Sequence, residues 1–297
     1  MTVTGSIRSL DRTERGFAAH SLQTLARDRA ALAGAGVVMV ALVIVAAAPL
    51  LAPSPPDLVD VTSRFAGSSA MHPLGTDQLG RDNLARLLYG GQLSLATAIL
   101  TTAAITAIGI IVGTITGYYG GVVDMLVMRV VDVFLALPRL VLALAVTGVL
   151  GPGLINLMIG IIAVGWADYS RLVRGAVLSI RERPYVESAR SVGATPARVM
   201  FRHILPNLLG QVLVLSTLDL GAILLTLSGL SFLGLGVRPP TPEWGTMLAE
   251  GKAFLDRAPQ LMVLPGLAIS LVVLGFNLLG DGLRDALDPR TRERRSE

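Results

Sequence analysis

The 297-residue sequence contains no cysteine, only one lysine, and few charged residues, which make up 15% of the chain. Without cysteine the chain forms no disulfide, no thiolate metal site and no cysteine nucleophile. Its three histidines, His20, His72 and His203, are far apart in the sequence. Because zinc-type coordination needs several convergent ligands, we expect no metal site.

The motifs of ATP-hydrolysing and hydrolytic enzymes are also missing. No Gly-x-x-x-x-Gly-Lys-Ser/Thr phosphate loop occurs, since Gly251-Lys252 lacks the upstream glycine and the following hydroxyl residue. Neither a Gly-x-Ser-x-Gly elbow nor a His-Glu-x-x-His pair is found. We therefore expect a chain that is not an enzyme and that binds no cofactor itself.

What the sequence has in excess is apolar surface: 52% of residues are hydrophobic, and the mean hydropathy is +0.64. This composition is typical of an integral membrane protein. A hydrocarbon core of ~30 Å requires about 20 apolar residues in helical form. The sequence accordingly predicts an all-α fold with six membrane-spanning helices, at 30–52, 93–116, 125–150, 154–173, 208–236 and 259–280.

The basic residues predict the orientation of these spans. With the N-terminus in the cytoplasm, 18 of the 25 Lys and Arg residues fall on the cytoplasmic side. The positive-inside rule then places both termini and residues 174–207 in the cytoplasm, and residues 53–92 and 237–258 outside. Positive charge beside hydrophobic runs favours membrane orientation over nucleic-acid binding. We divide the chain into 1–92, with the first span and outward loop, a transmembrane domain at 93–285, and a cytoplasmic tail at 286–297.

A few charged and small residues lie within the predicted spans. Asp219 is the only ionisable residue from 206 to 237. An unpaired carboxylate at membrane depth is costly, so lining of a translocation path and structural pairing both fit it. Gly109, Gly113 and Gly117, at four-residue spacing, predict a groove that lets another helix approach closely. Asp124, Arg129 and Asp132 are interpreted as an interfacial ion-pair cluster.

Residues 184–206, called the polar segment below, interrupt the apolar runs with helical punctuation. Pro184 is suited to a first helical position, and Gly193 to the left-handed residue that ends a helix. Thr195 and Pro196 predict the cap and first residue of a second helix. Tyr185, Ala189 and Val192 share one face of the first helix. Pro206 predicts a break or kink ahead of the fifth span.

Two interpretations of the polar segment follow from physics alone. Amphipathic helices with arginines bind anionic lipid headgroups, or they bind a protein partner. The order of residues resembles the "EAA" signature of permease subunits in bacterial binding-protein-dependent ABC importers. That resemblance implies docking on an ATPase subunit, through Glu187, Ser188, Ala189, Gly193, Ile204 and Pro206.

Other segments resemble the C-type permease of dipeptide and oligopeptide importers. They are His72 to Asp77, Gly80 to Asp82, Arg86 to Gly90, Leu230 to Gly236, Pro239 to Gly245 and Gly280 to Pro289. The sequence departs from the family pattern at four positions. Ser188 stands where the signature usually has Ala, and Leu227 where many relatives carry an acidic residue. Ala85 and Gln92 replace the Ser and Arg common in the outward segment.

The resemblance implies a multi-pass permease of the bacterial inner membrane that imports peptides. Its expected partners are a second permease, two ATPase subunits that use ATP and Mg²⁺, membrane lipid, and an outward binding protein contacting Glu243 and Trp244. No nucleic-acid partner is expected. Nickel complexes or haem remain alternative substrates within the family. An ion-coupled carrier is the alternative from a different class, and Asp219 is its only sequence support.

Overall fold

The computed structural model describes residue 26 and residues 28–287, and every regular element in this range is helical. The predicted all-α class is therefore confirmed for the described residues. The N-terminal arginines up to Arg27 and His20 lie outside this range, as does the predicted tail beyond Leu287. The α-helices are α2 (Arg29–Ala46), α3 (Ala48–Leu51), α4 (Asn83–Tyr119), α5 (Gly121–Leu135), α6 (Arg139–Leu150), α7 (Leu154–Arg181), α8 (Pro184–Ser191), α9 (Pro196–Val199), α10 (Leu205–Phe232), α11 (Trp244–Lys252) and α12 (Gln260–Leu287).

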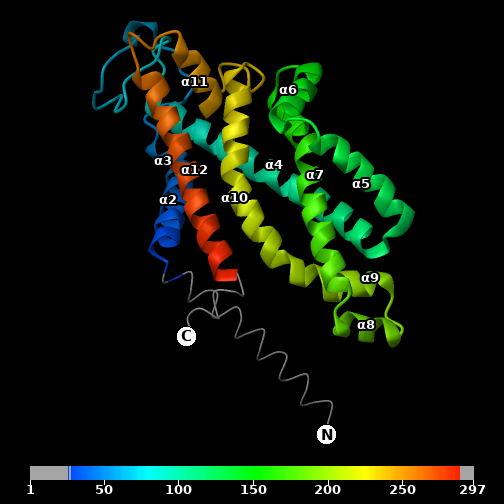
Figure 1. The fold of residues 1–297 in the computed structure, drawn as a ribbon. Coiled ribbons are helices and arrows are strands. Elements are labelled where there is room, and N and C mark those ends of the chain that lie inside the picture. Colours follow the sequence, from blue (N-terminus) through cyan, green and yellow to red (C-terminus); the bar gives the residue numbers. More distant parts are fainter. Residues whose placement is uncertain (1–25, 27, 288–297) are drawn as a thin grey trace.

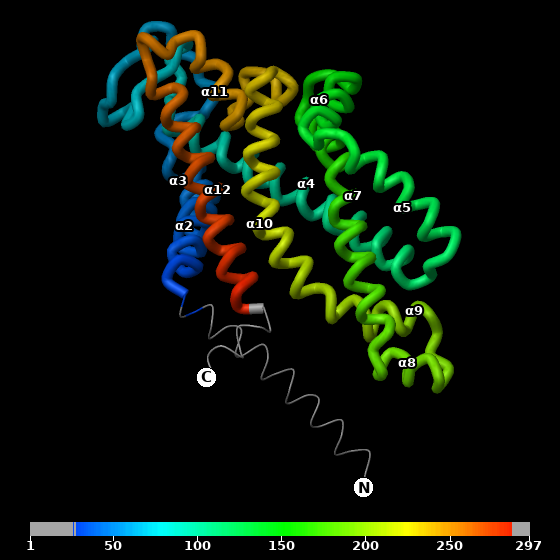
Figure 2. Tube along the Cα trace, in the orientation of Figure 1, coloured from blue at the N-terminus to red at the C-terminus, as the bar shows by residue number. Residues whose placement is uncertain are grey.

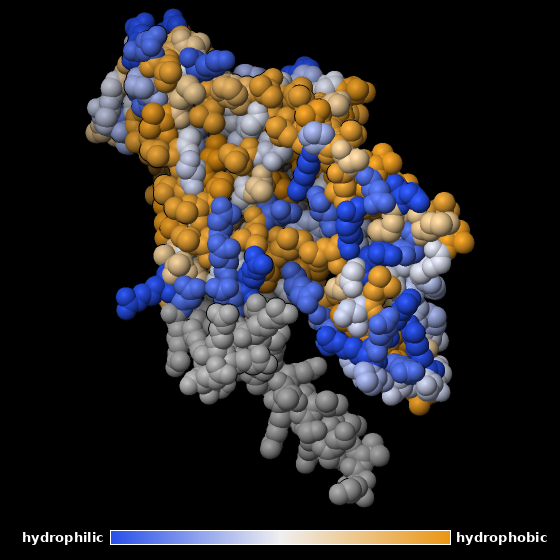
Figure 3. All heavy atoms as spheres, in the orientation of Figure 1, coloured by the Kyte–Doolittle hydropathy of each residue, from blue (hydrophilic) through white to orange (hydrophobic). Residues whose placement is uncertain are grey.

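Long helices run between two ends of the molecule (Figure 1). One end carries α8 and α9, together with the start of α2 and the end of α12. The opposite end carries α11 and two segments outside the long helices, 53–82 and 233–243, which together with α11 we call the cap. In the space-filling view, apolar side chains cover much of the middle, and hydrophilic ones gather around α8 and α9 (Figure 3). This distribution fits a molecule that crosses a bilayer with α8 and α9 in water.

Four helices are long and apolar enough to cross a membrane, and the bent pair α5–α6 makes up to five. The four are α2, α4, α12 and the continuous helix Pro196–Phe232. Helix α7 spans 28 residues but carries Asp168, Arg171 and Arg174, so it is not among them. The chain is thus multi-helical with four to five candidate spans, and the count of six stays a prediction.

The span predicted at 125–150 is not one unbroken helix. Helices α5 and α6 form separate rods with an angle of 92° between them, which the tube view shows clearly (Figure 2). The break lies at residues 136–138 and ends in Pro138, the N-cap residue of α6. A residue before proline is disfavoured in the helical region, so Leu137-Pro138 was a signal for this break.

Other predicted span limits also shift. Helix α2 ends at Ala46, and a short separate helix follows, so the first span is shorter than 30–52. Helix α4 begins ten residues before the predicted limit of 93, because the Asp82 carboxylate accepts a hydrogen bond from the Ala85 amide at 2.7 Å and caps it. The predicted domain division at 92/93 consequently falls inside α4.

Helices α4 and α7 pack closely through the predicted glycine groove. A Cβ atom added at Gly109 would lie 2.2 Å from the Tyr169 Cβ, and one added at Gly113 would lie 2.6 Å from the Ser170 carbonyl oxygen. At Gly117 the added atom would lie 2.8 Å from the Val177 Cβ. The prediction that these glycines admit another helix is confirmed, and α7 is that helix.

Helix α5 is tied to α7 by two ion pairs. Asp124 pairs with Arg174, and Asp132 pairs with Arg171. The predicted ion-pair cluster among Asp124, Arg129 and Asp132 is therefore wrong in its partners: both carboxylates pair with α7 arginines, 39 and 50 residues away. These long-range pairs have no local sequence signal.

Candidate functional site

The polar segment forms a helix, a glycine turn and a second helix, as predicted. Gly193 follows α8 with φ +83°. Its amide donates to the Arg190 carbonyl at 2.9 Å, and the Ala194 amide donates to the Ala189 carbonyl at 3.0 Å. These two bonds define a Schellman C-cap, which favours glycine at the left-handed position. Thr195 then caps α9 by accepting from the Arg198 amide.

Three apolar side chains anchor the polar segment to the rest of the chain. Val186, Val199 and Ile204 are completely buried. Ile204, predicted as a contact for an ATPase, therefore faces this chain's own core and supports the segment from within. The predicted apolar face of α8 is not the packed one, since Tyr185 is 41% exposed and Val192 85% exposed.

The remaining predicted coupling residues are at the surface. The exposed ones are Glu187, Ser188, Gly193 and Pro206, and Ala189 is half-buried. The Ser188 hydroxyl donates to the Pro184 carbonyl at 2.8 Å, so its replacement of Ala costs no unpaired polar group. Glu187, Tyr185 and Val192 are all exposed, so the surface of this helix and turn offers both a carboxylate and apolar side chains.

The helix continues through Pro206, so of the predicted break or kink the break is wrong. A π-helical turn at Met200–Ile204 joins α9 directly to α10. The Leu205 amide donates to the Met200 carbonyl five residues back, which is the π pattern. This wider turn directly precedes the proline, and through it α9 continues into α10 without a break.

The polar segment also touches α4. The Arg190 guanidinium lies 4.9 Å from the centre of the Tyr118 ring, at the end of α4. Arg181, at the end of α7, donates to the Tyr118 carbonyl at 3.1 Å. On the other side, the Asn207 side chain donates to the Tyr185 hydroxyl at 3.3 Å. Helix α8 thus contacts both α4 and α10, and α4 is joined to the end of α7 beside it.

The cap contains a buried network of charges. Arg81 donates to Asp77 at 2.6 Å and to Glu250 at 3.0 Å, and Arg86 donates to the same Glu250 oxygen at 2.7 Å. The arginines are only 1% and 2% exposed. Because Glu250 is more than 160 residues away in sequence, sequence reasoning missed this network. It fixes the start of α4 against α11.

Glu243 and Trp244 are buried beneath the surface of the cap, at 3% and 2% exposure. The Glu243 carboxylate caps α11 by accepting from the Gly245 and Thr246 amides, both at 2.9 Å. The Trp244 indole donates to the Leu87 carbonyl at 2.9 Å. Their predicted contact with a binding protein stays a prediction, and in this structure both side chains contact the chain itself.

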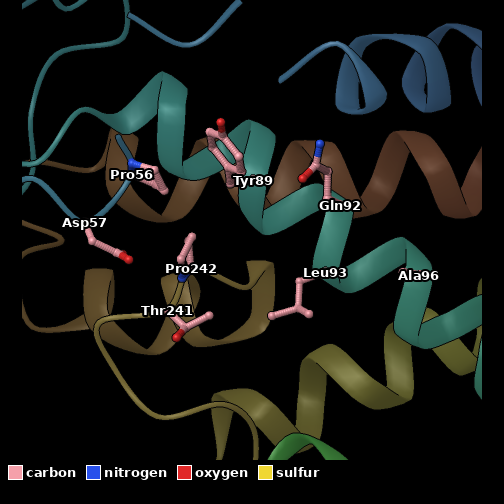
Figure 4. A pocket seen from close by; sticks show the side chains of 8 residues that line it. All are labelled: Pro56, Asp57, Tyr89, Gln92, Leu93, Ala96, Thr241 and Pro242. Atoms are coloured by element: carbon pink, nitrogen blue, oxygen red, sulfur yellow. The ribbon is translucent and has the colours of Figure 1, made fainter. Parts of the chain in front are cut away.

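A pocket of about 390 Å³ opens beside these residues (Figure 4). Three segments contribute to it: the loop after α3, the first half of α4, and the turn before α11. The lining residues are Pro56, Asp57, Tyr89, Gln92, Leu93, Ala96, Thr241 and Pro242.

Asp219 lies at the middle of α10 and is half-buried. Its carboxyl group lies next to the Tyr169 hydroxyl and within electrostatic range of Arg139 and Asp168. Among the described residues no group of three or more metal-ligating side chains converges.

Comparison with known proteins assigns this chain to a protein family. Residues 109–293 match the family model described as "Binding-protein-dependent transport system inner membrane component". The chain is 41% identical to a dipeptide transport system permease protein of Alkalihalophilus pseudofirmus, over 92% of this chain and 90% of the relative. It is 42% identical to a di/tripeptide transport system permease protein of Pseudomonas aeruginosa, over 91% of each. It is 46% identical to a glutathione transport system permease protein of Escherichia coli, over 76% of this chain and 75% of the relative.

Proposed function

Since the chain belongs to the family of inner-membrane components of binding-protein-dependent transport systems, we propose that it imports short peptides as one permease subunit of an ABC importer. The substrate class is supported by relatives named for dipeptides, di- and tripeptides and glutathione, all of which are short peptides. A permease subunit is not itself an enzyme, so the energy for transport comes from ATP and Mg²⁺ in partner subunits.

The proposed topology has six spans. They are α2, α4, the bent pair α5–α6, α7, α10 and α12, with the polar segment and the two described ends in the cytoplasm. Helix α7 is included because it packs against the glycine face of α4 and because its charges pair with α5 and α6. A charged helix is tolerated at membrane depth when its charges face protein or water.

The observation that carries the proposal is the geometry of the polar segment. It is a rigid helix–turn–helix, anchored by Val186, Val199 and Ile204, with Glu187 exposed at its tip. Closure of two ATPase subunits on ATP would push this segment, and its contacts with α4, α7 and α10 would carry the movement into the spans. ATP and peptide then bias the same two-state element from separate sites, which is allosteric coupling.

Outside the membrane, we propose that the cap docks a peptide-loaded binding protein. The exposed residues 238–241 and the adjacent pocket provide its surface. Glu243 and Trp244 hold this surface in place from below. The second permease completes the passage.

Purification from native membranes followed by transport tests this function. The complex should contain a nucleotide-binding chain in stoichiometric amount, and in liposomes it should accumulate labelled alanyl-alanine only with ATP and the binding protein. Accumulation driven by an ion gradient without a nucleotide-binding chain would establish the ion-coupled carrier instead.

A further inference from the structure

A group of polar side chains meets at mid-depth where α4, α7 and α10 converge. The hydroxyls of Thr106 on α4 and Ser216 on α10 are hydrogen-bonded at 3.0 Å. Between these helices, Tyr169 is completely buried, and its hydroxyl has no partner of standard hydrogen-bond geometry in the described part of the chain. That hydroxyl lies beside Thr106, Ser216 and Asp219. A buried polar group without a full partner is costly, so this hydroxyl is stabilised by any partner that reaches it.

The depth of this group follows from the helix limits. Asp219 is the fifteenth of 28 residues in α10, and Asp168 is the fifteenth of 28 in α7. Both carboxylates therefore lie near the middle of helices long enough to span the hydrocarbon core. At that depth an ionisable side chain faces protein or a water-filled path, because facing lipid costs several kcal/mol.

An ion pair lies near this group of polar side chains. Arg139 begins α6, directly after the bend with α5, and its guanidinium lies 3.7 Å from the Asp168 carboxylate. These side chains are 40% and 47% exposed. Hydrophilic side chains correspondingly interrupt the apolar surface in the region between α10 and the α6–α7 pair (Figure 3).

The balance of charge selects the kind of ligand. Arg139 and Asp168 neutralise each other, whereas Asp219 forms no ion pair within 4 Å with any described residue. One negative charge is left beside an unsatisfied hydroxyl. A carboxylate ligand would be repelled here, and a cationic ligand would be attracted.

We propose that Asp219, with Tyr169 and Ser216 beside it, binds the terminal ammonium group of a peptide during its passage through the membrane. The ammonium donates to the Asp219 carboxylate and to the two hydroxyl oxygens, and the Arg139–Asp168 pair borders the site. This deepens the proposed peptide-import function and rests on it. The site recognises the terminal ammonium group, which every unmodified peptide carries, and it does so irrespective of the peptide's side chains.

The test is a cycle of two permeases and two peptides in liposomes with the complete importer. Alanyl-alanine carries the terminal ammonium, and N-formyl-alanyl-alanine lacks it. Uptake of both is measured for the unmodified chain and for Asp219→Asn, each relative to its membrane level. For each permease, uptake of alanyl-alanine is divided by uptake of the formyl peptide, and the two quotients are then compared as a ratio of ratios. The binding protein's own preference is the same with both permeases, so it cancels in this comparison.

We expect Asp219→Asn to lower uptake of alanyl-alanine about tenfold or more, as for loss of a charged hydrogen bond, and to affect the formyl peptide much less. Asp219→Glu keeps the charge and should restore most of the preference. Asp281→Asn makes the same substitution at an exposed position near the end of α12 and should leave the ratio unchanged.

A ratio of ratios near one, with both permeases transporting, would overturn the subsite and leave peptide import standing. The same outcome would follow if a cation of the second permease neutralised Asp219, because the peptide ammonium would then not be needed. If the unmodified complex transports neither peptide, the proposed function itself fails.

Discussion

At the scale of single residues, Gly193 determines the direction of the polar segment. Its φ of +83° lies in the left-handed region, and a Cβ at this position would meet nothing within 4 Å. Any penalty for a larger residue therefore comes from the backbone alone and not from a clash. A larger side chain would fit at this exposed position, but the turn requires the backbone to keep its positive φ.

Gly193→Val should abolish most transport, because a β-branched residue at positive φ costs about 1–2 kcal/mol or more and re-aims α9. Gly193→Asn should be close to the unmodified chain, since Asn tolerates the left-handed region. Peptide uptake in liposomes measures both. Gly175→Val is the control, because Gly175 also has open space but lies within helix α7 with no positive φ. Equal uptake by both valine variants would contradict the role of the turn.

Trp244 illustrates a residue whose burial changes its expected role. Trp244→Ala should lower the free energy of unfolding by ~3–5 kcal/mol, as for other buried large-to-small changes. Trp244→Phe keeps most of the packing and loses the hydrogen bond to the Leu87 carbonyl, so it should cost about 1 kcal/mol. Thermal unfolding of the detergent-solubilised chain checks this order. An unchanged melting temperature in Trp244→Ala, with loss of binding-protein affinity only, would show that Trp244 is a surface contact.

At the scale of helices, the contact between α4 and α7 holds the centre of the bundle. The backbones approach closely because Gly109, Gly113 and Gly117 present no side chain. Helix α7 in turn carries the arginines that pair with α5 and the Tyr169 ring that borders Asp219. The glycine face therefore positions both helix α5 and the polar side chains around Asp219.

Gly113→Ala should destabilise this contact, because the new methyl group would lie 2.6 Å from the Ser170 carbonyl oxygen, and backbone cannot move aside cheaply. We expect a loss of about 1–3 kcal/mol, measured as a lower melting temperature. The matched control is Gly148→Ala on α6, where an added Cβ meets nothing within 4 Å. If the two variants have the same melting temperature, α4 and α7 do not pack through their glycines.

Local features of these elements were predictable, and contacts between distant segments were not. Pro184, Gly193 and Thr195 act on their nearest neighbours in the chain, so their turn and cap were read correctly from sequence. The four-residue glycine spacing also indicated a close contact, although not its partner. Leu137-Pro138 favours a bend, but the apolar run continues through it and favours a single span, so the two local signals conflict.

The cap and the charges of α7 gave no comparable signal. Arg86 and Glu250 meet only because α4 and α11 fold together. Arg171 and Arg174 reach their carboxylates across 39 and 50 residues. Likewise, nothing local distinguished a buried Trp244 from an exposed one. Pairings of this kind depend on tertiary structure, which a single sequence does not reveal.

At the scale of the whole molecule, the two ends have different surfaces and, in the proposed topology, face different compartments. The end with α8 and α9 is hydrophilic and exposes Glu187. The other end carries the cap with its pocket. A signal passing between them has continuous helices to follow, since α9 extends into α10 and α10 reaches the turn before α11.

Single cysteines test this arrangement in a chain that has none of its own. Ala197→Cys on α9 and Thr241→Cys in the cap are both at exposed positions. A membrane-impermeant thiol reagent added outside intact cells should label Thr241→Cys, and Ala197→Cys should react only after the membrane is opened. Labelling of both from outside would rule out the six-span topology.

The central claim is that the polar segment transmits ATP-driven movement into the spans. The most direct measurement is binding-protein-stimulated ATP hydrolysis and peptide uptake in the same liposomes, for Glu187→Arg and for its control Glu182→Arg, an exposed carboxylate just outside the segment. We predict that Glu187→Arg inserts normally but loses both stimulated hydrolysis and uptake. The reason is that it replaces the carboxylate that would face the ATPase subunit with a cation. The control Glu182→Arg should retain both activities. Near-normal stimulation in Glu187→Arg, with tighter binding to anionic lipid, would contradict the account and make the segment a headgroup-binding element.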